Sequence, residues 1–200
     1  LGLQPRKFIL VTMHRAENVD VEDRLRNLVE ALAYLHERYG YPVICSFHPR
    51  TRAKVESFGV NINYAGLQFL EPLGFFDFIR LEQSAFCVIS DSGTVQEEAC
   101  IFGTPNVTIR DVTERPETLE CGSNVLAGCD PARILKLVEM VTSRAAQAVR
   151  AAAMSFLRFS SGMIDSSFRM RPANALKTAA VQAKPQYNVL QSAAICRVSR

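Results

Sequence analysis

A chain of 200 residues and 22.3 kDa suits one large domain or two small ones. Its composition, 48% hydrophobic with a mean hydropathy of +0.04, is typical of a soluble globular protein. No apolar run reaches the roughly 18 residues that a membrane span requires, and the amino terminus holds no hydrophobic stretch of signal-peptide length. The sequence therefore predicts no membrane contact, and without an initiator Met we expect the chain to be cut from a longer protein.

Charge is unevenly distributed along the chain. Residues 1–150 carry 16 Lys and Arg against 19 Asp and Glu, whereas residues 151–200 carry 7 against 1. A basic tail of this kind either binds a polyanion or is simply a poorly ordered terminus. Because it has no interleaved aromatic residues and no reader motif, we expect no nucleic-acid partner. We treat residues 1–150 as one domain and residues 151–200 as a separate basic tail.

The six cysteines show no C-x-x-C pair and no Cys/His cluster of the zinc type, so we expect no metal site. Cys45, Cys87 and Cys100 lie in apolar runs, where a free thiol packs as a small hydrophobic side chain. This usage is typical of a reducing compartment and favours the cytoplasm.

The predicted elements begin with a β-branched run at residues 8–12 (FILVT), which indicates a buried strand. Residues 22–38 have leucines at spacings of three and four, typical of one face of a helix. We expect Asp20 to cap the start of this helix and Gly40 to end it. A second buried strand is predicted at residues 42–47 (PVICSF).

Strand and helix continue to alternate along the rest of the domain. The further predicted elements are a strand at 61–65, a helix at 75–84, a strand at 86–90, a helix at 94–102, strands at 106–109 and 123–127, and a helix at 131–150. Strands that are apolar on both faces and separated by helices indicate a parallel sheet covered on both sides. With right-handed crossovers, the sequence predicts a doubly wound, Rossmann-like α/β domain.

In such a sheet, ligands bind where loops leave the carboxyl ends of the strands. The loop at residues 90–94 (SDSGT) supplies a Gly that lets a ligand approach the backbone, and a helix start whose N–H groups attract an anion. Thr94 and Glu97 fit a capping box, and Glu98 can accept hydrogen bonds from sugar hydroxyls. The alternative is that the loop is only a well-capped helix start.

Three further loops lie at the same predicted edge. His14 and Arg15 follow the first strand and face either a phosphate or only solvent. Residues 110–117 hold two Arg and three acids, which form either a diphosphate contact or a surface salt-bridge network. His48 is the weakest candidate, because it could merely satisfy a buried loop carbonyl. Since the chain has no Walker lysine and no G-x-G-x-x-G motif, this donor-rich edge predicts a nucleotide-sugar site.

Four stretches resemble, in the same order, the signature of the non-hydrolysing UDP-N-acetylglucosamine 2-epimerases. They are residues 12–18 (TMHRAEN), His48 with Pro49, residues 71–81 (EPLGFFDFIRL) and residues 91–117 (DSGTVQEEACIFGTPNVTIRDVTERPE). The match runs through the predicted domain and covers only the carboxyl-terminal domain of that family.

The resemblance implies two Rossmann-like domains in the glycosyltransferase-B arrangement, with the active site in the cleft between them. It implies inversion at C2 of a UDP-2-acetamido sugar, by loss of UDP to give a 2-acetamidoglucal and its re-addition on the other face, without metal, nicotinamide or another cofactor. The implied partners are the UDP-sugar, the amino-terminal domain that this chain lacks, and a second copy in a homodimer. The implied setting is bacterial surface polysaccharide synthesis in the cytoplasm.

The resemblance also implies roles for single residues. It places His14 beside the leaving diphosphate, where it stabilises developing negative charge. It places Arg15 and His48 in a second, activating nucleotide-sugar site of some bacterial members. The residues that match UDP-binding positions are Ser92, Gly93 and Thr94 at the diphosphate (Thr94 where many members have a second Gly), Arg115 at the phosphates, Glu98 at the ribose and Phe78 near the uracil.

Two departures bear on what this chain does alone. The acid/base carboxylates of the family lie in the absent domain, so we expect weak UDP binding and no turnover. Residues 151–200 match nothing in the family pattern. Two rivals stay open: a glycosyltransferase of the same architecture, and a non-catalytic nucleotide-binding module. The substrate is either UDP-N-acetylglucosamine or a modified relative, which the TMHRAENVD stretch slightly favours.

Overall fold

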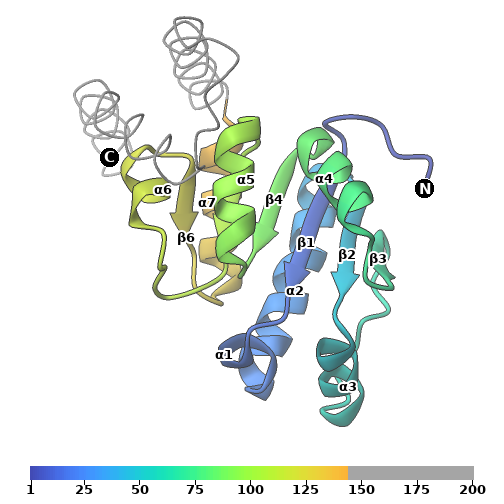
Figure 1. Ribbon diagram of the computed structural model, residues 1–200. Coiled ribbons are helices and arrows are strands. Elements are labelled where there is room, and N and C mark those ends of the chain that lie inside the picture. Colours follow the sequence, from blue (N-terminus) through green and yellow to red (C-terminus); the bar gives the residue numbers. More distant parts are fainter. Residues whose placement is uncertain (144–200) are drawn as a thin grey trace, which may run out of the picture.

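Six parallel strands form one sheet in the computed structural model, which describes residues 1–143 (Figure 1). The strands are β1 (Ile9–Met13), β2 (Val43–Phe47), β3 (Leu67–Leu70), β4 (Cys87–Ser90), β5 (Asn106–Thr108) and β6 (Asn124–Leu126). Their order across the sheet is β3-β2-β1-β4-β5-β6, so the winding reverses between β1 and β4. This arrangement confirms the predicted doubly wound, Rossmann-like α/β fold.

Helices cover both faces of the sheet. They are α1 (Ala16–Val19), α2 (Glu22–Tyr39), α3 (Pro49–Ser57), α4 (Phe75–Ser84), α5 (Gly93–Phe102), α6 (Pro116–Glu120) and α7 (Pro131–Thr142). Helices α2 and α7 contact each other behind the sheet in the view of Figure 1, whereas α4 and α5 contact each other in front of it. Helices α1 and α3 lie below the ends of β1 and β2 (Figure 1). The strands therefore end at an edge that loops and short helices surround.

The strands are buried on both faces because their side chains alternate between two cores. Along β1, Ile9 and Val11 belong to the larger core, which contains the apolar faces of α2 and α7. Leu10, between them, belongs to a smaller core with Val95 of α5 and the partly buried Phe78 of α4. This alternation explains why the strands read as continuous apolar runs in the sequence.

The third strand was predicted at residues 61–65, and that prediction is wrong, because β3 lies at Leu67–Leu70. Within the predicted stretch, the side chain of Asn61 accepts a hydrogen bond from the backbone N–H of Asn63 at 3.0 Å. Such a local bond offers the backbone an alternative to a sheet ladder. The chain then turns at Gly66, whose φ of +77° is in the left-handed region, before β3 begins.

Two predicted helix caps are also wrong, whereas the predicted end of α2 at Gly40 is confirmed by its φ of +67°. Val21, not Asp20, stands at the N-cap of α2 without a side-chain bond. Asp20 instead caps the end of α1 and pairs with Arg50 and Lys54 of α3. Its hydrogen bond with Arg50 is the main reason that the pKa of Asp20 is lowered.

The predicted capping box of α5 does not form. The helix begins at Gly93 with Ser92 at the N-cap, and no side-chain bond caps it. Thr94 is exposed on the first turn, and Glu97 is paired with Arg115. The Thr94 and Glu97 side chains therefore do not cap the first backbone N–H groups of α5 as the sequence pattern predicts.

Helix α3 is not predicted from the sequence, in which His48 and its neighbours have the composition of a loop. Pro49 occupies the first turn, and the His48 ring accepts a hydrogen bond from the backbone N–H of Arg50 at 3.2 Å.

The helix predicted at residues 131–150 is present as α7, and its remainder lies outside the described residues, as does the tail at 151–200. Within residues 1–143, no helix is long and apolar enough to cross a membrane.

Candidate functional site

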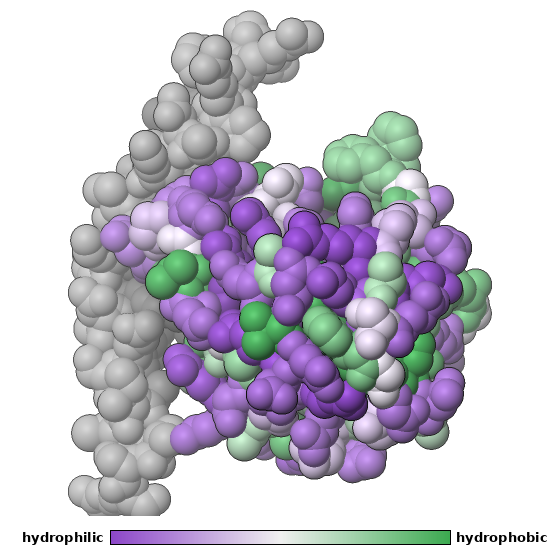
Figure 2. Space-filling model, turned by 90° about the horizontal axis from the view of Figure 1, so that it is seen from below, coloured by the Kyte–Doolittle hydropathy of each residue, from purple (hydrophilic) through white to green (hydrophobic). Residues whose placement is uncertain are grey.

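The loops that leave β1, β4 and β5 come together where the winding of the sheet reverses. Figure 2 shows the molecule from below, which is the side on which the strands end in Figure 1, and this face is largely hydrophilic. In open α/β sheets, the crevice at this switch point is the usual ligand site. The structure therefore places the predicted polar loops at the edge where the sequence predicts them.

Asp91 joins the first two of these loops. Its fully buried carboxylate accepts hydrogen bonds from the backbone N–H groups of His14 at 3.0 Å and Arg15 at 2.9 Å, and from the Asn18 amide at 3.1 Å. It also lies 3.0 Å from Nδ1 of His14. Burial alone raises the pKa of Asp91, but the bonds from His14, Arg15 and Asn18 outweigh it, and the net pKa is lowered.

The bond to Asp91 orients the His14 ring. Because Nδ1 faces the carboxylate, Nε2 on the far side of the ring is the nitrogen left for a ligand. The sequence reading gave Asp91 no role and therefore missed this contact. The signal in the sequence was a carboxylate placed directly after the strand predicted at residues 86–90.

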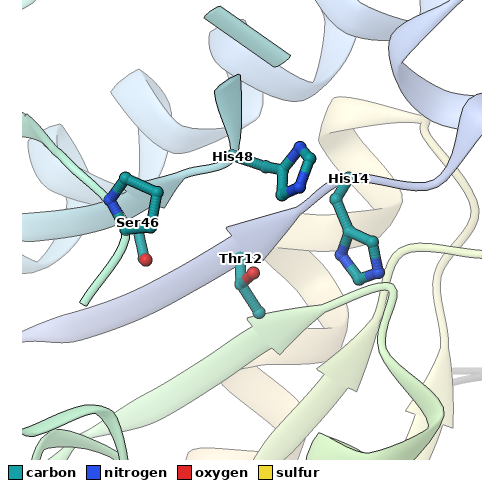
Figure 3. Close-up of a pocket in the computed structure, with 5 residues that line it drawn as sticks. Thr12, His14, Ser46 and His48 are labelled. Carbon is teal, nitrogen blue, oxygen red and sulfur yellow. The ribbon is translucent and has the colours of Figure 1, made fainter. Parts of the chain in front are cut away.

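A pocket of about 200 Å³ opens beside His14, between the ends of β1 and β2 (Figure 3). Its lining residues are Thr12, His14, Ser46, His48 and Pro72. The two imidazole rings lie 6.3 Å apart between centroids, at 43° to each other. His48 is exposed and accepts a bond from a backbone N–H, so the alternative that it satisfies a buried carbonyl is wrong.

The start of α5 lies against the segment that leads into α6. A Cβ added to Gly93 would meet Cγ and Nε of Arg115 at 3.9 Å each, so the arginine side chain passes over this glycine. Nε of Arg115 also lies 2.8 Å from a carboxylate oxygen of Glu97. The first N–H groups of a helix have no partner within it, so Arg115 and these N–H groups together offer positive potential at one point. Ser92, Gly93 and Thr94 belong to the same turn.

The two arginines of residues 110–117 have different surroundings. Arg110 is 4% exposed and is bonded to Glu17 at 2.6 Å and to both oxygens of Glu114, at 2.5 and 2.9 Å. This contact lowers the pKa of Glu114 to about 2. Arg110 thus belongs to a salt-bridge network, whereas Arg115, whose side chain is 38% exposed, pairs with one carboxylate among residues 1–143.

Glu98 lies further along α5, next to a second carboxyl group on α4. That group, Glu82, is fully buried, and its oxygens have no hydrogen-bond donor of standard geometry among residues 1–143. Burial, followed by the charge of Glu98, raises the pKa of Glu82 to about 8. Burial also raises the pKa of Glu98 itself. Phe78, one turn before Glu82, packs its partly buried ring on the smaller core.

Gln96 connects the interior of α5 to the segment that carries Arg115. Its buried Oε1 accepts bonds from the Thr113 hydroxyl at 2.6 Å and the Asn124 amide at 3.1 Å. The Thr113 hydroxyl in turn accepts the backbone N–H of Arg115 at 3.0 Å. This network is not predictable from the sequence, because a single Gln in a helical stretch carries no pattern.

Among the described residues, no group of three or more His, Cys, Asp or Glu side chains is placed to hold a metal ion.

Residues 2–162 match the family model described as UDP-N-acetylglucosamine 2-epimerase. The chain belongs to this family. It is 41% identical over 140 residues to UDP-N-acetylglucosamine 2-epimerase of Methanocaldococcus jannaschii, covering 68% of this chain and 38% of that protein. It is 46% identical over 121 residues to UDP-2,3-diacetamido-2,3-dideoxy-D-glucuronate 2-epimerase of Pseudomonas aeruginosa, covering 60% of this chain and 33% of that protein.

A solved structure of the family shares the fold. The Methanocaldococcus jannaschii UDP-GlcNAc 2-epimerase in complex with UDP-GlcNAc and UDP matches with a TM-score of 0.66 and 35% identity, covering 78% of this chain and 45% of that one. The family predicted from four short stretches is thereby confirmed. The chain spans less than half the length of each of these epimerases.

Proposed function

We propose that this chain is the UDP-binding half of a sugar-nucleotide 2-epimerase. The observation that carries the proposal is the assembly at the switch point, where Asp91 fixes His14 beside the start of α5 and Arg115 passes over Gly93. Membership of the epimerase family supports the same reading. The substrate class is a UDP-2-acetamido sugar, a description that fits both relatives.

In this proposal the diphosphate docks on the first turn of α5. The free N–H groups of that turn and the guanidinium of Arg115 complement its charge, with Arg115 exchanging the Glu97 carboxylate for a phosphate. The residues assigned to UDP are Ser92, Gly93, Thr94 and Arg115 at the diphosphate, Glu98 at the ribose hydroxyls and Phe78 near the uracil.

The proposed reaction begins with cleavage of the bond between the sugar C1 and the diphosphate. Negative charge develops on the departing oxygen, and a protonated His14 donates from Nε2 to it while Asp91 balances the ring from the other side. Loss of the C2 proton gives the 2-acetamidoglucal, and re-addition of UDP with protonation on the other face inverts C2. Arg115 and the start of α5 hold the diphosphate between these two steps.

The base that removes the C2 proton belongs, in this proposal, to an amino-terminal domain facing this edge of the sheet. A positioned base is required for that step, so the chain on its own binds UDP weakly and catalyses no inversion. We further propose that the complete protein is a homodimer and acts in the cytoplasm in surface polysaccharide synthesis.

Arg15 and His48 stay assigned to a second nucleotide-sugar site. The His48 ring lines the same pocket as His14, so a second site at this position would adjoin the reacting one. Nε of Arg15 is buried without a hydrogen-bond partner among the described residues, which leaves a donor for a ligand at this edge.

The test is incubation of a protein that contains this chain and its amino-terminal domain with UDP-sugars in deuterated water, without acceptor. We expect C2 inversion with one deuterium at C2. In the same protein we expect His14→Ala to lower turnover about 100-fold or more while the affinity for UDP changes by no more than a few-fold. Absence of C2 exchange across UDP-2-acetamido sugars contradicts the proposal, and sugar transfer on adding an acceptor supports the glycosyltransferase instead. Loss of UDP affinity without loss of turnover contradicts the role of His14.

A further inference from the structure

Two thiols from different helices face each other outside the UDP site. Sγ of Cys100, near the end of α5, lies 3.7 Å from Sγ of Cys121, the residue that caps the end of α6. Both side chains are partly exposed, whereas Cys45 and Cys87 are buried in the sheet. The expectation that Cys100 only packs as a hydrophobic side chain is therefore incomplete.

The two thiols differ in their polar partners. The Cys121 thiol donates towards the Ser123 hydroxyl at 3.3 Å and the Thr118 carbonyl oxygen at 3.5 Å, and the Ser123 hydroxyl donates to the same carbonyl oxygen at 3.1 Å. The hydrogen bond from the Cys100 thiol lowers the pKa of Cys121, and Ser123 adds to this against the opposing effect of burial. The same contact and burial raise the pKa of Cys100. A thiolate beside a thiol is the arrangement of reactive dithiols.

We propose that Cys100 and Cys121 are a redox modification site that forms a reversible disulfide between α5 and α6. The disulfide bond length is roughly 2.05 Å, so from their separation of 3.7 Å the sulfurs must approach by less than 2 Å. Because α6 begins directly after Arg115, the bond would anchor the segment that carries this arginine to α5. This disulfide would form whichever ligand the edge of the sheet binds.

The chemistry requires a low-molecular-weight disulfide such as oxidised glutathione. The Cys121 thiolate attacks one sulfur of that disulfide and releases one glutathione thiolate, which leaves a mixed disulfide on Cys121. Cys100 then loses its proton to solvent and attacks the Cys121 sulfur, releasing the second glutathione thiolate. The two cysteines lose two electrons, and the glutathione disulfide gains them.

The experiment equilibrates the full chain in glutathione buffers of graded oxidised-to-reduced ratio, quenches it by acid and alkylation, and maps the bonds by mass spectrometry. Cleavage after Glu and Arg places Cys100 in residues 99–110 and Cys121 with Cys129 in residues 121–133, and fragmentation separates the last two. We expect one linked pair, Cys100–Cys121, that disappears with dithiothreitol. In Cys100→Ser, we expect Cys121 to carry glutathione instead.

Cys129→Ser is the matched control and should leave the Cys100–Cys121 bond at the same buffer midpoint as the unchanged chain. Mapping of the unchanged chain needs no variant, so a folding defect in a Ser variant does not obscure the result. Linkage of either cysteine to a different partner, or only mixed disulfides on the unchanged chain, overturns the proposal. Free thiols at both positions in fully oxidised glutathione also overturn it.

Discussion

Two buried carboxyl groups in this chain show how local partners decide the charge of a residue. Asp91, directly after β4, and Glu82, on α4, are both fully buried. Asp91 accepts two backbone N–H bonds and one amide bond, so its ionised form is stabilised. Among residues 1–143 Glu82 has no comparable donor, and it lies beside Glu98, so its protonated form is favoured. Asp91 is thus a fixed negative charge at the site, and Glu82 holds a proton near neutral pH.

This difference predicts how stability depends on pH. The pKa of Glu82 is about 8 in the folded chain, above the unfolded value of about 4.3, so the folded state holds a proton that the unfolded state has released. Its contribution to stability is fully present below about pH 4.3 and is lost as pH rises through 8. Between pH 6 and pH 8, urea titrations should show a loss on the order of 1–2 kcal/mol in the free energy of unfolding that Glu82→Gln abolishes.

Glu56→Gln, at an exposed position of α3, is the control and should keep the slope of the unchanged chain. An equal pH slope in Glu82→Gln and in the unchanged chain would show that Glu82 is ionised in the folded state.

At the scale of elements, the strands are predictable because burial on both faces gives a continuous apolar run. The long helix α2 is predictable because burial of one face gives leucines at a regular spacing. The strand at 61–65 was misplaced because the bond between Asn61 and Asn63 competes with pairing, an effect that hydropathy does not record. Helix α3 was missed because its charged sequence, PRTRAKVES, has only two buried positions. Caps were misassigned because Asp20 has stronger partners on α3.

The candidate site was predictable to a different extent. His14, Ser92, Gly93 and Arg115 lie in segments that follow strand ends, and these segments share one edge because the strands are parallel. The residues that hold them in place, Asp91 and Gln96, act through contacts over long sequence separations. Such contacts join residues far apart in the sequence and follow no regular spacing, so the sequence pattern does not predict them.

The hydrogen bonds that Gln96 of α5 accepts from Thr113 and Asn124 should contribute to stability. In Gln96→Leu, the Thr113 hydroxyl and the Asn124 amide each lose an acceptor in a buried place. We expect the free energy of unfolding to fall by roughly 1–3 kcal/mol, measured by urea denaturation. Gln83→Leu, an exposed glutamine on α4, is the matched control and should change stability by less than about 0.5 kcal/mol. Equal effects of both changes would show that the buried network is not a source of stability.

At the scale of the whole molecule, the proposed function makes the described residues one face of a reaction site. The loops that surround the ends of β1, β4 and β5 bring together an arginine side chain, the first turn of α5 and an oriented imidazole. In the proposed function the base that acts on the sugar belongs to an amino-terminal domain, and this chain spans 38% of the length of its Methanocaldococcus jannaschii relative. We therefore expect this chain to bind UDP without turnover.

The most direct measurement is a UDP titration of the isotopically labelled 200-residue chain, followed by amide NMR shifts. We expect the largest shifts at residues 92–94 and an affinity lowered about tenfold or more in Arg115→Ala. Arg38→Ala removes an arginine from the last turn of α2 and should leave the affinity unchanged. Shifts centred away from the start of α5, or equal affinity in Arg115→Ala and the unchanged chain, would contradict the proposed function.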